Sequence, residues 1–120
     1  MDRFSKWVDE NTAEDAVFYT QRYDAFLVRV FIQRPVFIDW AFPFDESYIA
    51  EFGRRYAIKK SVAKAPLKAF YCLAETEKLD YVIRHDSYVD PQYYDQAVFN
   101  IPSMRVYDVR KPLFEAPCAG

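Results

Sequence analysis

Residues 24–44 constrain the fold most, because they form the densest apolar run in the chain. The run has about the length of a membrane span, which needs roughly 20 apolar residues. Three charged residues inside it, Arg29, Arg34 and Asp39, would cost about 8 to 10 kcal/mol at the centre of a bilayer, whereas its apolar side chains return about 5 kcal/mol. Pro35 also removes a helix hydrogen bond in the middle of the run. An isolated transmembrane helix is therefore disfavoured, unless a larger membrane complex shields these charges.

The same run is better explained as a core segment that is interrupted at Pro35. The residue before a proline avoids helical backbone angles, so a helix or strand should end near Gln33. A second apolar element should then follow over residues 36–42 and end at Pro43. We expect the whole run to be buried against the rest of the chain or against a partner.

Apolar residues recur at helical spacing through most of the first 83 residues. A short helix is expected over residues 2–10, with Trp7 as its anchor. A second helix is expected from about residue 13 towards residue 30. The alternative is a fully buried strand over residues 25–33, since such strands also have continuous apolar runs.

Two further helices are expected in the middle of the chain. Asp45 is suited to cap a helix that runs to about Lys64. Pro66 suits the first turn of another helix, which runs to about Ile83. That helix could instead break at Thr76 and leave a strand over residues 80–85.

The last third of the chain changes character, since it holds four of the seven prolines. Prolines spaced this closely exclude long helices. A short helical piece over residues 93–99 and a short strand over residues 104–109 are expected there. We predict one globular domain over residues 1–99 and an extended C-terminal arm over residues 100–120. The predicted fold class is mostly α, with about three helices packed around an apolar segment; α+β with a small sheet is the alternative.

Glycine is scarce, since Gly53 and Gly120 are the only two in 120 residues. A phosphate-binding P-loop, a dinucleotide-binding fingerprint and an EF-hand loop each need glycine at fixed places, and none can be written here. The Gly-x-Ser-x-Gly nucleophile elbow of hydrolases is excluded by the same count. These exclusions favour a protein without catalytic chemistry.

Cysteine and histidine usage leaves little room for a metal or a nucleophile. Cys72 and Cys118 are the only cysteines and His85 is the only histidine, so one chain has too few ligands for a structural zinc site. No metal site and no cofactor are expected. Cys72 with His85 is formally a nucleophilic pair, but neither residue has a diagnostic local context. Whether the two cysteines form a disulfide stays open.

The strongest local anomaly is a basic cluster in a chain whose net charge is −2. No acidic residue lies between Phe52 and Lys68, and four-residue spacing would place like charges on shared helix faces, where they repel. This pattern indicates an anionic partner, such as acidic lipid headgroups, an acidic protein surface or RNA phosphate. A solvated helix face balanced by carboxylates from elsewhere would show the same pattern. The candidate residues are Arg54, Arg55, Lys59, Lys60, Lys64 and Lys68.

Residues 81–95 interleave tyrosine with aspartate. This tract is either an acidic, aromatic docking strip or a Tyr-rich loop at the edge of the domain. Together with an anchor in the C-terminal arm, it supplies the interface candidates Tyr88, Tyr93, Tyr94 and Phe114.

Three classes of function remain. We expect a non-catalytic accessory or structural subunit of a larger multiprotein assembly, such as a mitochondrial complex or a virion, whose partners are other protein subunits. The first alternative is a free-standing inhibitor or adaptor, for example a phage-encoded one, that uses the acidic Tyr-rich surface. The second is a small enzyme without a recognisable motif. Sequence-specific nucleic-acid binding is not expected at this net charge, and the polar N-terminus predicts no secretory signal.

Overall fold

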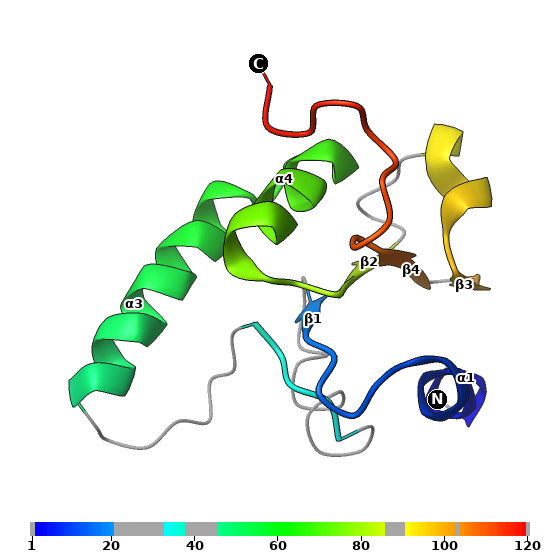
Figure 1. Ribbon diagram of the computed structural model, residues 1–120, viewed down its shortest axis with the longest axis horizontal. Coiled ribbons are helices and arrows are strands. Elements are labelled where there is room, and N and C mark those ends of the chain that lie inside the picture. Colours follow the sequence, from blue (N-terminus) through cyan, green and yellow to red (C-terminus); the bar gives the residue numbers. More distant parts are fainter. Residues whose placement is uncertain (1, 21–32, 38–45, 86–90, 103, 120) are drawn as a thin grey trace.

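The computed structural model describes residues 2–20, 33–37, 46–85, 91–102 and 104–119 (Figure 1). The described part of the chain contains three α-helices, one 3-10 helix and four strands. In chain order these are α1 (Asp2–Asn11), β1 (Phe18–Thr20), α3 (Glu46–Ser61), α4 (Leu67–Glu77), β2 (Tyr81–His85), the 3-10 helix η2 (Pro91–Gln96), β3 (Phe99–Ile101) and β4 (Met104–Asp108).

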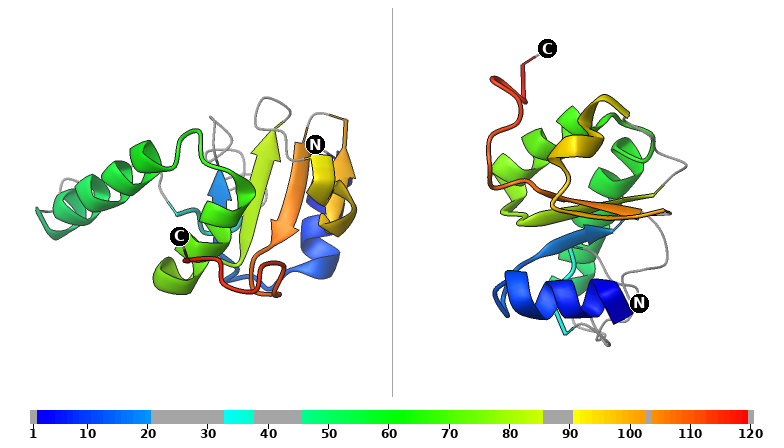
Figure 2. Two further views of the ribbon diagram at one scale, coloured as in Figure 1. Left: turned by 90° about the horizontal axis from the view of Figure 1, so that it is seen from above. Right: turned by 90° about the vertical axis from the view of Figure 1, so that its right-hand side faces the viewer.

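The strands form one mixed sheet in the order β1-β2-β4-β3. β1 and β2 are parallel and are joined through α3 and α4, whereas β2 and β4, and β3 and β4, are antiparallel. Helix α1 covers one face of the sheet, and α4 and η2 cover the other (Figure 2). Helix α3 extends away to the side of the sheet (Figures 1 and 2). The fold is therefore α+β: the prediction of a mostly α protein is wrong, and its alternative with a small sheet describes the chain.

The misleading signal came from strands that are buried on both faces. Phe18, Tyr19 and Thr20 of β1 are all buried, so the strand lacks the alternation of apolar and polar residues that marks a half-buried strand. The helix predicted over residues 13–30 is therefore wrong at β1. Residues 21–32, which also carry most of the alternative strand, lie outside the described part.

The helix predicted to reach Ile83 ends at Glu77. Lys78 follows in the left-handed conformation (φ 57°) and donates its backbone N–H to Ala74 O, an ordinary way to end a helix. β2 then begins at Tyr81, so the alternative break with a strand over residues 80–85 is confirmed.

Other predicted elements are confirmed within a few residues. The N-terminal helix, the central helix predicted from Asp45 to about Lys64, the short helical piece near residue 93 and the strand from residue 104 correspond to α1, α3, η2 and β4. The proposed cap Asp45 and most of the run over residues 24–44 lie outside the described residues. Within the described residues, no helix combines the length and apolar character needed to cross a membrane.

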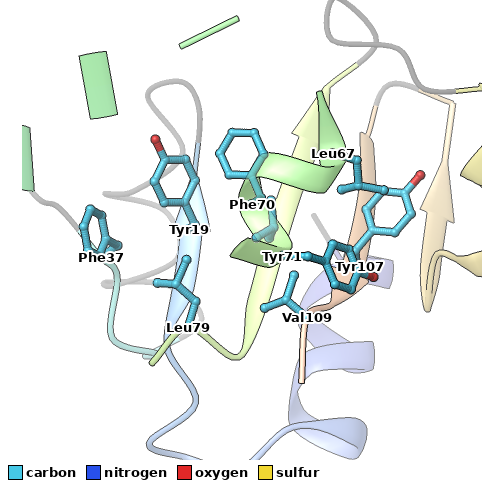
Figure 3. Packing of buried hydrophobic residues seen from close by; sticks show 9 residues of the cluster. Tyr19, Phe37, Leu67, Phe70, Tyr71, Leu79, Tyr107 and Val109 are labelled. Carbon is cyan, nitrogen blue, oxygen red and sulfur yellow. The ribbon is translucent and has the colours of Figure 1, made fainter. Parts of the chain in front are cut away.

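The sheet separates two apolar cores. On one side, Tyr81 and Ile83 of β2 pack with Phe4 and Val8 of α1. On the other side, the neighbouring Val82 faces α4, as expected for a strand whose side chains alternate between faces. Figure 3 shows this second core, where α4 lies over β1, β2 and β4. Its labelled members are Tyr19, Phe37, Leu67, Phe70, Tyr71, Leu79, Tyr107 and Val109.

The C-terminal region differs from the predicted arm over residues 100–120. β3 and β4 belong to the sheet, and β4 lies between β2 and β3. Residues 109–119, here called the C-terminal segment, contain no helix or strand. The ring of Phe114 packs edge-on against Tyr71 and Tyr93, with ring centroids 5.2 and 5.1 Å apart. The segment therefore folds back over the domain's own α4 and η2.

Candidate functional site

A groove of about 630 Å³ lies between α3, α4 and the C-terminal segment, and is called the α3–α4 groove below. Most of its lining is apolar, and its volume falls within the range of ligand pockets, roughly 300 to 1,000 Å³. The lining includes Ile58 of α3, Val62 in the turn that follows α3, Ala69 and Leu73 of α4, and Pro117 and Ala119 of the C-terminal segment.

The helical period of α4 places one set of its side chains against the sheet and another set along the groove. Leu67, Phe70 and Tyr71 are buried towards the sheet. Ala69 and Leu73, which are four residues apart, share a neighbouring face and line the groove. One helix therefore closes a core on one side and forms the floor of a groove on the other.

The C-terminal segment reaches the groove through a covalent bond. A disulfide joins Cys72 in α4 to Cys118, and its two Cα atoms are 4.7 Å apart. Lys68 Nζ donates a hydrogen bond to Ala119 O at 3.2 Å. These contacts place Pro117 and Ala119 against the groove. The open question about the two cysteines is settled in favour of a disulfide, which also removes Cys72 as a nucleophile for His85.

The two ends of α4 carry opposite charges. Lys64 lies in the turn before α4 and Lys68 in its first turn, whereas Glu75 and Glu77 lie in its last turn. The 11 residues of the helix separate these ends by roughly 16 Å. Glu77 is paired with Arg54, whose Nη2 is 2.8 Å from Glu77 Oε1. Lys68 lines the groove near the start of α4, whereas at the other end the charge of Glu77 is balanced by Arg54 and Glu75 lies beside the lining residues.

Carboxylates at both borders of the predicted basic cluster balance its arginines. Arg54 bridges Glu51 and Glu77 at 2.6 and 2.8 Å, and Arg55 contacts Glu51 at 2.9 Å. Hydrogen bonds from Arg54 and Arg55 lower the pKa of Glu51 to about 2. Arg55 also donates to Phe37 O at 2.7 Å and lies over the Phe37 ring. The two arginines connect α3 to α4 and to residue 37.

The lysines of the basic cluster are dispersed in the structure. Lys59 Nζ donates to Thr20 O at 3.4 Å, and Lys60 lies 5.7 Å above the Tyr56 ring. Lys68 contacts the C-terminal segment, while Lys64 is exposed in the turn. Each lysine therefore has different surroundings, and the anionic partner stays a prediction.

The predicted interface tyrosines contact the protein itself. Tyr93 packs on Phe114, and the guanidinium of Arg105 lies 3.7 Å from the Tyr94 ring centroid, a cation–π contact. Tyr88 lies outside the described residues. Tyr93, Tyr94 and Phe114 therefore help to hold η2 and the C-terminal segment against the domain.

A polar corner at the end of β4 was not predicted from the sequence. Arg110 Nε and Nη2 each donate to the carboxylate of buried Asp108 at 2.9 Å, and Nη2 also donates to Tyr81 OH at 2.8 Å. Burial opposes ionisation of Asp108, but the hydrogen bonds from Arg110 outweigh it and lower the pKa of this carboxyl. Desolvation by burial raises the pKa of Tyr81. In the sequence, the only sign of this network is that Asp108 and Arg110 lie two positions apart, which is too common a spacing to predict it.

The described residues contain no group of three or more His, Cys, Asp or Glu side chains that could hold a metal ion. Comparison with known proteins adds one finding. Residues 1–58 match the model of a family described as a domain of unknown function (DUF6798). This match covers just under half of the chain and ends before α4, so it includes only part of the α3–α4 groove. No curated protein and no solved structure matches the chain.

Proposed function

We propose that this chain is a non-catalytic binding domain of a larger protein assembly, and that it binds an amphipathic helical segment of a partner protein in the α3–α4 groove. The observation that carries this proposal is the groove itself, whose lining is mostly apolar, with Lys68 near one end of α4 and Glu75 beside the other. Partners that insert a helix into a groove present apolar side chains at spacings of three, four and seven residues.

Apolar surface supplies the driving force. Burying such surface is worth roughly 25 cal/mol per Å² before the costs of association. Elsewhere on α3, outside the groove lining, Tyr56 stacks on Phe52 with ring centroids 6.2 Å apart. Tyr56 remains 37% exposed and is the one exposed large hydrophobic residue of the described part. Tyrosine in such a position is typical of binding surfaces.

Charge complementarity selects the chemistry of the partner. Lys64 and Lys68 favour acidic side chains at one end of the docked segment, and Glu75 favours basic side chains at the other. A segment that carries both charges would lie along α4 in one direction. Burial of its apolar residues would provide the affinity, and the charged ends would provide the orientation.

The alternatives have less support. Tyr93 and Tyr94, which an inhibitor with an acidic Tyr-rich surface would use, are only partly exposed and contact Phe114 and Arg105. A nucleophilic enzyme would need a thiol at Cys72, which is bonded to Cys118. The groove requires neither feature.

A labelled peptide tests the proposal. The probe is a helical peptide of about 18 residues with leucines at i, i+3, i+4 and i+7, glutamates at one end and lysines at the other; the control peptide has serine in place of leucine. Fluorescence anisotropy should show saturable binding of the leucine peptide only. The variant Leu73→Glu should weaken binding by about tenfold or more, because it places a charge in the apolar groove.

The matched control is Asn100→Glu, which adds the same charge at an exposed position of β3 and should bind as the unmodified protein does. Circular dichroism verifies that both variants are folded. If the leucine peptide does not saturate the protein, or if Leu73→Glu binds it as well as Asn100→Glu, the proposed function is wrong.

A further inference from the structure

We infer that the C-terminal segment is a third wall of the α3–α4 groove that exists only while Cys72 and Cys118 are oxidised, so that partner binding requires the disulfide. This inference rests on the proposed function. It assigns a role in binding to the C-terminal segment, which lies outside both helices, and it predicts that thiol reductants weaken binding.

The position of the bridge supports this role. Cys72 lies in the middle of α4, on the floor of the groove, and Cys118 lies between two residues that line it, Pro117 and Ala119. The bridge joins positions 46 residues apart, so it connects parts of the chain that are distant in sequence. Cutting it would detach one side of the groove from its floor.

Little else holds the end of the segment. The described side-chain contacts of residues 115–119 with α4 are the disulfide, the Lys68 Nζ to Ala119 O hydrogen bond, and the contacts of Cys118 Sγ with Cys72 O at 3.6 Å and Glu75 Oε2 at 3.5 Å. An exposed hydrogen bond adds little net stability, and ordering a residue of the backbone opposes it with a comparable entropy cost. The segment would therefore leave the groove after reduction.

The rest of the fold should remain after reduction, because the segment has a separate anchor. Phe114 packs between Tyr71 and Tyr93, upstream of the bridge. Reduction should therefore free residues 115–119 while the sheet and both cores stay closed. This separation allows the groove to change without unfolding of the domain.

The redox step is ordinary thiol–disulfide exchange with a dithiol. A thiolate of the dithiol attacks Cys118 Sγ, which belongs to an exposed residue, and Cys72 leaves as a thiolate and takes up a proton. The second thiol of the reductant then displaces Cys118. Two electrons and two protons pass to the protein, which gains two thiols, while the dithiol becomes a cyclic disulfide.

The experiment compares oxidised protein with protein reduced by dithiothreitol, using the leucine peptide and hydrogen-exchange mass spectrometry. Reduction should weaken peptide binding by about fivefold or more and accelerate exchange in residues 115–119, with exchange in β2 and β4 unchanged. Equal affinity in fully reduced protein, with the mass gain of two hydrogens verified, would overturn the inference and leave the proposed function intact.

A second pair of variants tests the wall with the disulfide in place. Pro117→Asp puts a charge into the wall and should weaken peptide binding, whereas Pro112→Asp, at an exposed position outside the groove, should not. Equal binding by the two variants would also overturn the inference. Failure of the oxidised protein to bind the peptide at all is a different result: it rejects the proposed function, and hydrogen exchange then tests separately whether the bridge holds the segment.

Discussion

Arg34 shows how a charge inside an apolar run is accommodated. Its side chain is buried, with Nε donating to Thr12 Oγ1 at 3.0 Å and Nη2 lying 3.4 Å from Val8 O and 3.3 Å from Thr12 O. These acceptors lie at the C-terminal end of α1, where the helix dipole favours a cation, and Val8 O also accepts the backbone N–H of Thr12 at 3.0 Å. Arg34 thereby connects residues 33–37 to the first helix.

Replacing Arg34 with methionine should destabilise the fold by about 1 to 3 kcal/mol, because buried carbonyls lose a charged donor. Urea unfolding followed by circular dichroism measures this loss. The control is Arg3→Met, at an exposed position of α1, the helix that Arg34 contacts. It should change the free energy of unfolding by less than about 0.5 kcal/mol. Similar values for the two variants would show that Arg34 does not cap α1.

Asp108 makes stability depend on pH in a defined direction. Its pKa is lower in the folded protein than its ordinary value of 3.8, so the unfolded chain takes up a proton first as the pH falls. The stabilisation is therefore complete above about pH 5 and is lost as the pH falls through the lowered pKa.

The variant Asp108→Asn should lower the free energy of unfolding by about 1 to 3 kcal/mol at pH 7, because it removes the ion pair with Arg110. The loss is limited because the Arg110 side chain is half exposed, so water can solvate it. Thermal unfolding at pH 7 and at pH 3 measures the effect. The difference between the two proteins should shrink at pH 3. An equal difference at both pH values would contradict the assigned role of the carboxylate.

At the scale of elements, α3 carries a glycine that nothing in its surroundings requires. A Cβ atom added at Gly53 meets no heavy atom within 4 Å, and the helix continues on both sides of it. Glycine inside a helix costs roughly 0.5 to 1 kcal/mol relative to alanine. The residue therefore weakens the helix that forms one side of the groove.

Gly53→Ala should stabilise the protein by about 0.5 to 1 kcal/mol, and the matched change Ala57→Gly, one turn later and also exposed, should destabilise it by a similar amount. Differential scanning calorimetry of both variants gives the two signs. A destabilising Gly53→Ala would indicate that position 53 is packed against something in solution.

Element type could be predicted where one face of an element meets water. α1 places Phe4 and Val8 in the core while its other face is exposed, so the spacing of its apolar residues correctly predicted a helix. β1 and β2 have neighbours on both faces, so buried side chains follow one another and the pattern resembles a helix. The error in fold class has this single physical cause.

At the scale of the whole molecule, the disulfide closes a loop between residues 46 positions apart. Such a bridge stabilises a protein mainly by restricting the unfolded chain. Its loss through Cys72→Ser with Cys118→Ser should lower the free energy of unfolding by about 2 to 4 kcal/mol. Denaturant unfolding of the oxidised protein and the double variant measures this difference; equal midpoints would show that the bridge does not form in solution.

The candidate site was less predictable than the elements that form it. The sequence shows six basic residues between positions 54 and 68. It does not show that Glu51, before this cluster, and Glu77, after it, both pair with Arg54. Tyr93 and Phe114 were predicted as interface residues, and the sequence did not reveal that their rings pack against each other within the chain. The α3–α4 groove depends on two helices and a distant segment meeting, and no local pattern encodes that meeting.

The sequence by itself determined the short helices, the strand at β4, the proline-rich end without long helices and the exclusion of glycine-dependent motifs. These features follow from local backbone preferences, which each residue carries wherever it lies in space. Tertiary structure alone decided the sheet, the Cys72–Cys118 bridge, the balancing of the basic cluster and the groove. Each of these joins residues far apart in the chain, and their energies arise only when folding brings the partners together.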